Sequence, residues 1–286
     1  MQTRIILILA CLLAATASLA RASTRGPGTI VAAFYPIAYA AEQIAPPGTK
    51  VKNLTPAGAE PHDIELTPSD VAAIDKSSIV LYLGQGFQPA VEKAVKAAHV
   101  QALDLLAGQV LDSGTIEGKT GLDPHLWLDP IRYAQMATRI GQALHRPRQA
   151  AAFVARLHAL DRLYRTGLRR CRRTTIVTSH AAFGYLARRY GLTQRPLEGL
   201  SPEAEPSPKA LAKLIELVRK SGATTVFFET LLSPKLAETV AREAHVGTAV
   251  LDPIEGIAQD KLDHGTSYFT VMRSNLATLR VALGCR

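Results

Sequence analysis

Residues 148–170 read RQAAAFVARLHALDRLYRTGLRR, a stretch rich in Ala, Leu and Arg that has the composition of a long helix. It ends a longer segment, 130–170, which has no strand-like run and whose main interruption is Pro147. Short β-branched runs alternate with amphipathic stretches on both sides of it. We therefore predict a linking helix over 146–170 that joins two α/β lobes, 23–145 and 171–286. A single large α/β sheet is the alternative.

The strand-like runs fall into two sets of three: 29–34, 50–54 and 78–83 before the predicted linking helix, and 174–178, 224–228 and 248–251 after it. Strands that alternate with helices imply parallel sheets. Helix starts are marked by Thr67-Pro68, Ser207-Pro208 and Ser233-Pro234, each a capping hydroxyl before a proline at the first helical position. The predicted fold class is thus α/β, with a parallel sheet in each lobe.

Residues 1–22 have the pattern of a secretory signal peptide: Arg4, an apolar run of 16 residues over 5–20, and Ala20-Arg21-Ala22 as a cleavage site. The run is shorter than the ~20 residues that a membrane-spanning helix needs. A lipid anchor at Cys11 would leave only residues 5–10 as the apolar region, below the usual ~7 residues, so we do not favour it. The mature protein is predicted to be extracytoplasmic.

Charge does not predict a nucleic-acid or membrane-surface partner. The formal net charge of +9 falls to +7 once Arg4 and Arg21 leave with the signal peptide. The densest basic cluster, Arg169-Arg170 and Arg172-Arg173, has none of the interleaved aromatic residues on which single-strand binders stack bases. We interpret it as a solvated surface.

Four residues have the setting of a metal site. His62 and His180 follow strand-like runs, Asp252 directly follows another, and His125 lies between two Asp-Pro steps. In open parallel sheets, ligands bind beyond the carboxyl ends of the strands. Three imidazoles and a carboxylate suit Zn²⁺ better than Mg²⁺ or Ca²⁺. The ligands are far apart in sequence, so the chemistry alone also allows scattered loop histidines; His99, His145, His158, His245 and His264 are expected to be solvent-exposed.

Several short sequence motifs carry a specific resemblance. In order along the chain they are GAEPHD at 58–63 with ELTPS at 65–69, DPHLWLDP at 123–130, SHAAFGYL at 179–186, SPEAEPSP at 201–208, FFET at 227–230 and LDP at 251–253. Together they resemble the zinc- and manganese-specific solute-binding proteins of bacterial ABC importers. The resemblance covers essentially the whole mature chain.

The resemblance implies two lobes bridged by one rigid helix, with the metal in the cleft between them. It implies ligands at His62 and His125 from the first lobe and at His180 and Asp252 from the second. The implied cargo is Zn²⁺, with Mn²⁺ as the alternative, and the implied partner is the membrane permease of an ABC importer. We expect a monomer.

Two details bear on the metal. Zinc-type members often carry a His-rich loop before the second ligand, whereas 111–122 is short and contains no His. Manganese-preferring members commonly have Glu at the position of His180, and imidazole favours zinc over Mn²⁺. Glu60, beside His62, is expected either to approach the metal or to remain a loop surface acid.

Cys171 and Cys285 are the only cysteines left after signal removal, and an oxidising compartment favours their pairing. We predict a disulfide between them, with two free thiols as the alternative.

Two other functions compete with a zinc receptor. A secreted zinc metallohydrolase would need three His ligands, an open fourth position and a nearby base such as Glu60 or Glu229. The sequence contains neither HExxH nor GxSxG. An adhesin would rest on no motif at all. Ligation by Asp252 would fill the fourth position and exclude the hydrolase, so we predict a receptor and not an enzyme.

Overall fold

The structure is a computed structural model that describes residues 28–116, 119–201 and 207–286. The predicted signal peptide, 1–22, and Cys11 lie outside the described residues. No helix in the described ranges is long and apolar enough to cross a membrane.

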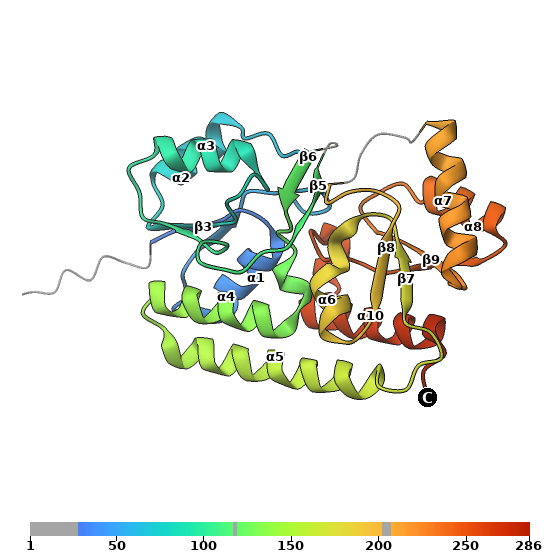
Figure 1. The fold of residues 1–286 in the computed structure, drawn as a ribbon. Coiled ribbons are helices and arrows are strands. Elements are labelled where there is room, and N and C mark those ends of the chain that lie inside the picture. Colours follow the sequence, from blue (N-terminus) through green and yellow to red (C-terminus); the bar gives the residue numbers. More distant parts are fainter. Residues whose placement is uncertain (1–27, 117–118, 202–206) are drawn as a thin grey trace, which may run out of the picture.

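Two separate parallel sheets form the centres of two lobes (Figure 1). The strand order in the first is β2 (Val51–Asn53), β1 (Ile30–Ala32), β3 (Ile79–Tyr82) and β4 (Ala102–Asp104), and every neighbouring pair is parallel. The order in the second is β10 (Gly247–Val250), β9 (Thr225–Phe228), β7 (Thr175–Thr178) and β8 (Thr193–Pro196), again all parallel. The predicted α/β class with two parallel sheets is confirmed, and the single large sheet is excluded.

Each of the six predicted strand runs contains a strand, while β4 and β8, two of the four edge strands, were not predicted. β4 reads Ala-Leu-Asp and β8 reads Thr-Gln-Arg-Pro, and both are partly exposed. Polar residues at a sheet edge weaken the β-branched pattern on which the prediction rests. A short antiparallel hairpin, β5 (Ser113–Ile116) and β6 (Lys119–Leu122), was also missed, and it precedes the loop of His125.

The long helix α5 (Pro147–Gly167) runs beneath both lobes in Figure 1. Its length of 21 residues corresponds to about 30 Å. It packs along α4 (Pro130–Ala143), where Phe153 meets the ring of Tyr133 edge-on, while Tyr164 nearer its end donates a hydrogen bond to the carbonyl of Met272. The α-helices that flank the sheets are α1 (Tyr35–Ile44), α2 (Pro68–Asp75), α3 (Pro89–Ala97), α6 (Gly184–Arg189), α7 (Pro208–Ser221), α8 (Lys235–Ala244), α9 (Gln259–Asp263) and α10 (Tyr268–Leu283).

Helix starts follow the predicted capping chemistry in two of three cases. Thr67 caps α2 in a capping box with Asp70, and Ser207 caps α7 by accepting a hydrogen bond from the N–H of Ala210. The third prediction is wrong by one residue. Helix α8 begins at Lys235, and Pro234 stands before it as the N-cap instead of as its first residue.

Helix α10 starts against the first lobe although its chain belongs to the second. The ring of Tyr268 lies 4.7 Å from that of Tyr133, and its hydroxyl donates to the carbonyl of Trp127 at 2.6 Å. The Tyr268 N–H donates to the hydroxyl of Tyr35 at 3.0 Å. Phe269 packs edge-on against Phe153 of α5. One continuous apolar core therefore runs through both lobes.

Cys171 and Cys285 form a disulfide in the structure. Beside it, the N–H groups of Arg172 and Arg173 donate to the carbonyl of Leu283 at 3.0 and 3.1 Å. These bonds join the end of α10 to the segment that connects α5 with β7.

Candidate metal centre

Four side chains from four segments meet between the lobes. His62 comes from the loop after β2, and His125 stands just after β6, where it precedes a short 3₁₀ helix (Leu126–Leu128). His180 follows β7 by two residues, and Glu255 lies in the turn after β10. Three of the four thus lie beyond the carboxyl ends of parallel strands, where a ligand site is expected.

The ligating atoms of this group point at one another. Glu255 Oε1 lies 3.4 Å from His62 Nε2, 3.1 Å from His125 Nε2 and 3.3 Å from His180 Nε2. The Nε2 atoms of His125 and His180 are 3.4 Å apart, and one atom from each residue falls within 4.8 Å of all the others.

These distances fit a tetrahedral zinc ion. Zn–N and Zn–O bonds of about 2.0–2.1 Å place neighbouring ligand atoms about 3.3 Å apart at the corners of a tetrahedron. The group is also enclosed: His125 and His180 are 0% exposed, Glu255 1% and His62 7%. The second carboxylate oxygen of Glu255 is buried without a hydrogen-bond partner, as expected where a cation satisfies a carboxylate.

Two carboxylates orient the imidazoles from behind. Asp123 Oδ1 lies 2.7 Å from His125 Nδ1, and Glu229 Oε1 lies 2.5 Å from His180 Nδ1. A carboxylate at Nδ1 fixes the tautomer that leaves Nε2 free to bind a metal, and it raises the basicity of the ring. Such partners complete a carboxylate–histidine–metal arrangement at two of the three imidazoles.

We expect Asp123→Asn to weaken zinc binding about 10-fold and Asp123→Ala up to about 100-fold, because both remove the charge that holds His125. Titration against a competing chromogenic chelator measures the change. Asp75→Asn, at an exposed carboxylate near the end of α2, is the matched control and should leave the affinity as it is. Equal affinities for wild type and Asp123→Ala would show that His125 is not oriented in this way.

Burial and charge act in opposite directions at these groups. Burial alone would lower the pKa of His180, but the neighbouring Glu229 and Glu255 carboxylates raise it well above its ordinary 6.5. The pKa of His125 is likewise raised, since Asp123 and Glu255 outweigh its burial. For His62 burial prevails and the pKa is lowered. Burial would raise the pKa of Glu255, but the imidazoles hold it well below 4.5.

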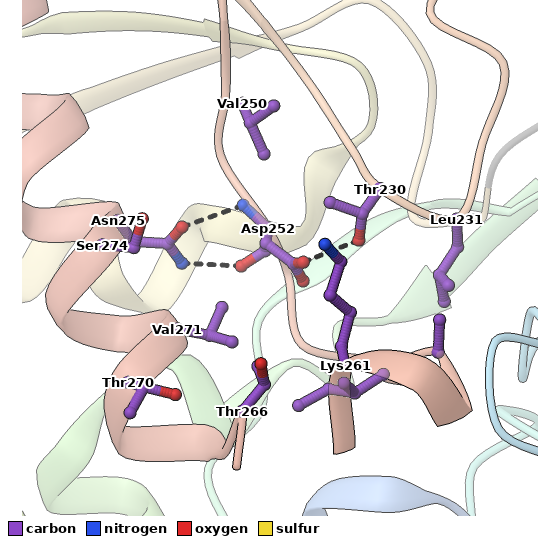
Figure 2. A pocket seen from close by; sticks show the side chains of 12 residues that line it. Thr230, Leu231, Val250, Asp252, Lys261, Thr266, Thr270, Val271, Ser274 and Asn275 are labelled. Atoms are coloured by element: carbon purple, nitrogen blue, oxygen red, sulfur yellow. Dashed lines mark hydrogen bonds between the residues drawn. The ribbon is translucent and has the colours of Figure 1, made fainter. Parts of the chain in front are cut away.

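Asp252, expected as the fourth ligand, is outside the group, and Glu255 takes its place. The Asp252 carboxylate accepts hydrogen bonds from the Thr230 hydroxyl at 2.6 Å and from the Ile254 N–H at 2.7 Å. Its backbone forms two bonds with the side-chain amide of Asn275 on α10, at 3.0 and 2.7 Å. Figure 2 shows Thr230 and Asn275 beside Asp252, in a pocket next to α10.

The role of Asp252 is to shape the turn that carries Glu255. Ile254 has a φ of +59°, which is strained for a β-branched residue and must be held by its surroundings. The Asp252 carboxylate holds the Ile254 N–H, and Trp127 Nε1 donates to the carbonyl of Pro253 at 2.6 Å. An Asp before Pro is a common turn former whose carboxylate binds the backbone two residues on. That turn signal was present in the sequence, but it does not by itself name the carboxylate that faces the imidazoles.

Glu60 stands next to the group without joining it. Its Oε1 accepts a hydrogen bond from the His62 N–H at 3.0 Å and lies 3.9 Å from His62 Nε2. Its other oxygen is buried without a partner. Burial and the nearby Glu255 raise the pKa of Glu60 to about 8. It is therefore not a simple surface acid.

Among the described residues, a cavity beside His62 forms a mouth of the site. This cavity of about 160 Å³ touches His62 and is bordered by Phe87, Pro124 and Leu200. The histidines expected to be exposed, His99, His145, His158, His245 and His264, are all exposed and lie outside the group.

Comparison with known proteins gives a consistent result. The family model ZnuA, described as zinc-uptake complex component A, periplasmic, matches residues 30–282. The high-affinity zinc uptake system protein ZnuA of Bacillus subtilis is 32% identical over 277 residues, which is 89% of this chain and 87% of that protein. The zinc-binding lipoprotein AdcA of Streptococcus pneumoniae is 34% identical, but this chain spans only 56% of its length.

Solved structures agree. The Zn(II)-bound ZnuA-like domain of S. pneumoniae AdcA superposes with a TM-score of 0.78 at 34% identity, over 90% of this chain and 99% of that one. The laminin-binding protein Lmb of Streptococcus agalactiae gives 0.79 at 28% identity, over 90% and 99%.

Two α/β lobes around an enclosed set of three imidazoles and a carboxylate define a receptor that encloses a metal ion and performs no chemistry on it. Within that class, the chain belongs to the ZnuA family, whose members are substrate-binding receptors and not enzymes.

Proposed function

We propose that this protein is an extracytoplasmic receptor that captures Zn²⁺ between its lobes and delivers it to the permease of an ABC importer. The observation that carries the proposal is that Glu255 Oε1 lies 3.1–3.4 Å from the Nε2 atoms of three buried imidazoles, close to the spacing of neighbouring ligands in a tetrahedral zinc shell. His62, His125, His180 and Glu255 are the proposed ligands.

A complete shell argues against the metallohydrolase. Catalytic zinc sites keep one position open for water or substrate, whereas this group supplies four ligands and is almost fully buried. Glu60 and Glu229, the candidate bases, are each hydrogen-bonded within the site, Glu60 to the His62 backbone and Glu229 to Ser179 and His180. The arrangement serves storage and transfer of the ion.

The ligand set also favours zinc over manganese. Three neutral nitrogens and one oxygen suit a borderline cation, whereas Mn²⁺ prefers more oxygen ligands. The relatives described above are named for zinc uptake and zinc binding. Mn²⁺ remains the competitor against which selectivity is measured.

The proposal extends to location and organisation. Residues 1–22 act as a signal peptide, and the mature chain works as a monomer without nucleic acid. Its parts are a first lobe over 23–145, a linking helix over 146–170 and a second lobe over 171–286. The family name places such proteins in the periplasm, and AdcA is named a lipoprotein, which supports an extracytoplasmic site of action.

One Zn²⁺ per chain should bind tightly and raise the melting temperature, because an ion that binds only the folded state stabilises it by mass action. At a free zinc concentration about 100 times the Kd the gain is about 2.7 kcal/mol. Elemental analysis with calorimetric unfolding tests this, and an assay with ester and peptide substrates tests for turnover. Two equally tight sites, or zinc-dependent hydrolysis, would contradict the receptor.

Zinc affinity should rise with pH through the neutral range. The neighbouring carboxylates raise the pKa values of His125 and His180, so protons compete with Zn²⁺ for these two rings up to higher pH than for an ordinary imidazole. Zn²⁺ that displaces such protons releases them to the buffer. Titration calorimetry in buffers of different ionisation enthalpy measures the protons released. Binding without proton release would contradict this account.

A further inference from the structure

The structure gathers arginines from two distant parts of the chain at one pole of the second lobe. Arg169, Arg170, Arg172 and Arg173 follow the end of α5, and Arg280 and Arg286 lie at the end of α10. The Arg286 N–H donates to the carbonyl of Arg170 at 3.0 Å, and the side chain of Arg172 lies against Gly284. The aliphatic stem of Arg280 lies against Gly167 of α5. We call these six residues the arginine pole.

The arginine pole is unneutralised and open to solvent. Five of its members are exposed and Arg173 is half-buried. Among the described residues, none of the six has a carboxylate within ion-pair distance, whereas the nearby Arg165 pairs with Asp161 at 2.8 Å. Helix dipoles favour cations only within the last turn, which accounts for Arg280 and not for the five that lie beyond the helix ends.

The pole lies away from the mouth of the metal site. Residues 169–173 precede β7 and His180 follows it, so the arginines and the metal ligands lie at opposite ends of the second sheet. In Figure 1 the ends of α5 and α10 are at the lower right, and hairpin β5–β6 is at the top. Val281, beside Arg280, is 84% exposed, the largest exposure among the large hydrophobic residues described.

We propose that the arginine pole binds the surface of an anionic lipid membrane. Phosphate headgroups offer guanidinium groups bidentate hydrogen bonds, and clustered arginines on one small face match a dense two-dimensional array of such groups. An exposed valine among the arginines suits the boundary between headgroups and acyl chains and would be an unfavourable feature of a purely aqueous surface. The arginine pole would hold the receptor near the membrane in which the permease lies.

Nucleic acid fits this face less well. Neither 169–173 nor 280–286 contains an aromatic residue on which a base could stack. Tyr164 and Tyr190, the aromatic residues that precede and follow 169–173 in the chain, stack on each other.

The test is co-sedimentation of the full mature chain with vesicles of phosphatidylcholine alone and with about one third phosphatidylglycerol. Wild type should bind only the anionic vesicles and should leave them as salt rises well above 0.1 M, where screening shortens to less than about 10 Å. The variant Arg169→Gln/Arg170→Gln/Arg172→Gln should partition about a hundredfold more weakly, at about fivefold for each charge lost.

The matched control is Lys93→Gln/Lys96→Gln/Lys213→Gln, which removes the same charge from exposed residues of α3 and α7. It should bind almost as wild type does, and both variants should keep wild-type zinc affinity, which separates this inference from the proposed function. Equal losses in the two variants would reduce the effect to net charge and overturn the proposal. Failure of wild type to bind anionic vesicles, including the case in which it binds soluble polyphosphate through the same arginines, would also overturn it.

Discussion

Glu255→Ala is expected to abolish tight zinc binding, whereas Asp252→Asn should retain it. The alanine variant removes the only carboxylate among the four ligand atoms and leaves three imidazoles, two of them with raised pKa values, without the negative charge that they surround. The loss should exceed the roughly 10–100-fold that an outer-shell partner costs.

Asp252→Asn keeps the shape of the turn. The asparagine oxygen can accept from the Ile254 N–H, and its amide can donate to the Thr230 hydroxyl, so zinc affinity should fall by less than about 10-fold. Competition titrations of both variants under one buffer decide the question. If Asp252→Asn lost zinc and Glu255→Ala kept it, the fourth ligand would be Asp252.

His180 controls the second large effect. His180→Ala should weaken both Zn²⁺ and Mn²⁺, because it opens the shell and leaves Glu229 buried without its imidazole partner. His180→Glu exchanges a borderline nitrogen for a hard oxygen, so zinc should lose more affinity than manganese. The new carboxylate would face Glu229, whose like charge opposes its ionisation.

The selectivity test therefore needs His180→Glu combined with Glu229→Gln, which offers the new carboxylate a neutral partner. His245→Ala is the control, since His245 is exposed at the end of α8 and lies outside the group. An unchanged ratio of zinc to manganese affinity in the double variant, or a loss in His245→Ala equal to that in His180→Ala, would contradict the placement of the site.

The sequence carried the frame of the fold because its inner strands are short, apolar and β-branched. The strand Thr-Ile-Val-Thr at 175–178 is an example. The long helix α5 could also be predicted, because its composition is strongly helical and a proline stands at its first position. The edge strands β4 and β8 escaped prediction because a polar strand such as β8 is held by its neighbour β7 and not by its own pattern. Its assignment depends on tertiary context, which a single sequence does not display.

The histidines of the site could be predicted from their positions. His62, His125 and His180 each occupy a loop in which a histidine without a functional role is not expected. The fourth ligand could not be predicted in this way. Asp252 and Glu255 are three residues apart in one turn, and only the backbone geometry at Ile254 decides which carboxylate faces the imidazoles. A rule based on nearness to the strand end chooses the residue that holds the turn instead of the one whose carboxylate faces the imidazoles.

The contact of α10 with the first lobe limits how this receptor can release its ion. Swinging the lobes apart as rigid bodies would pull Tyr268 away from Tyr133 and break its hydrogen bonds to Trp127 and Tyr35. Each aromatic side chain exposed in such a hinge motion would cost about 1.5–3 kcal/mol. Local displacement of the loops around His62 and Leu200 leaves these contacts of Tyr268 intact. The permease would then act on the loops at the rim of the mouth. The ion would leave through a local loop movement and not through a rigid-body separation of the two lobes.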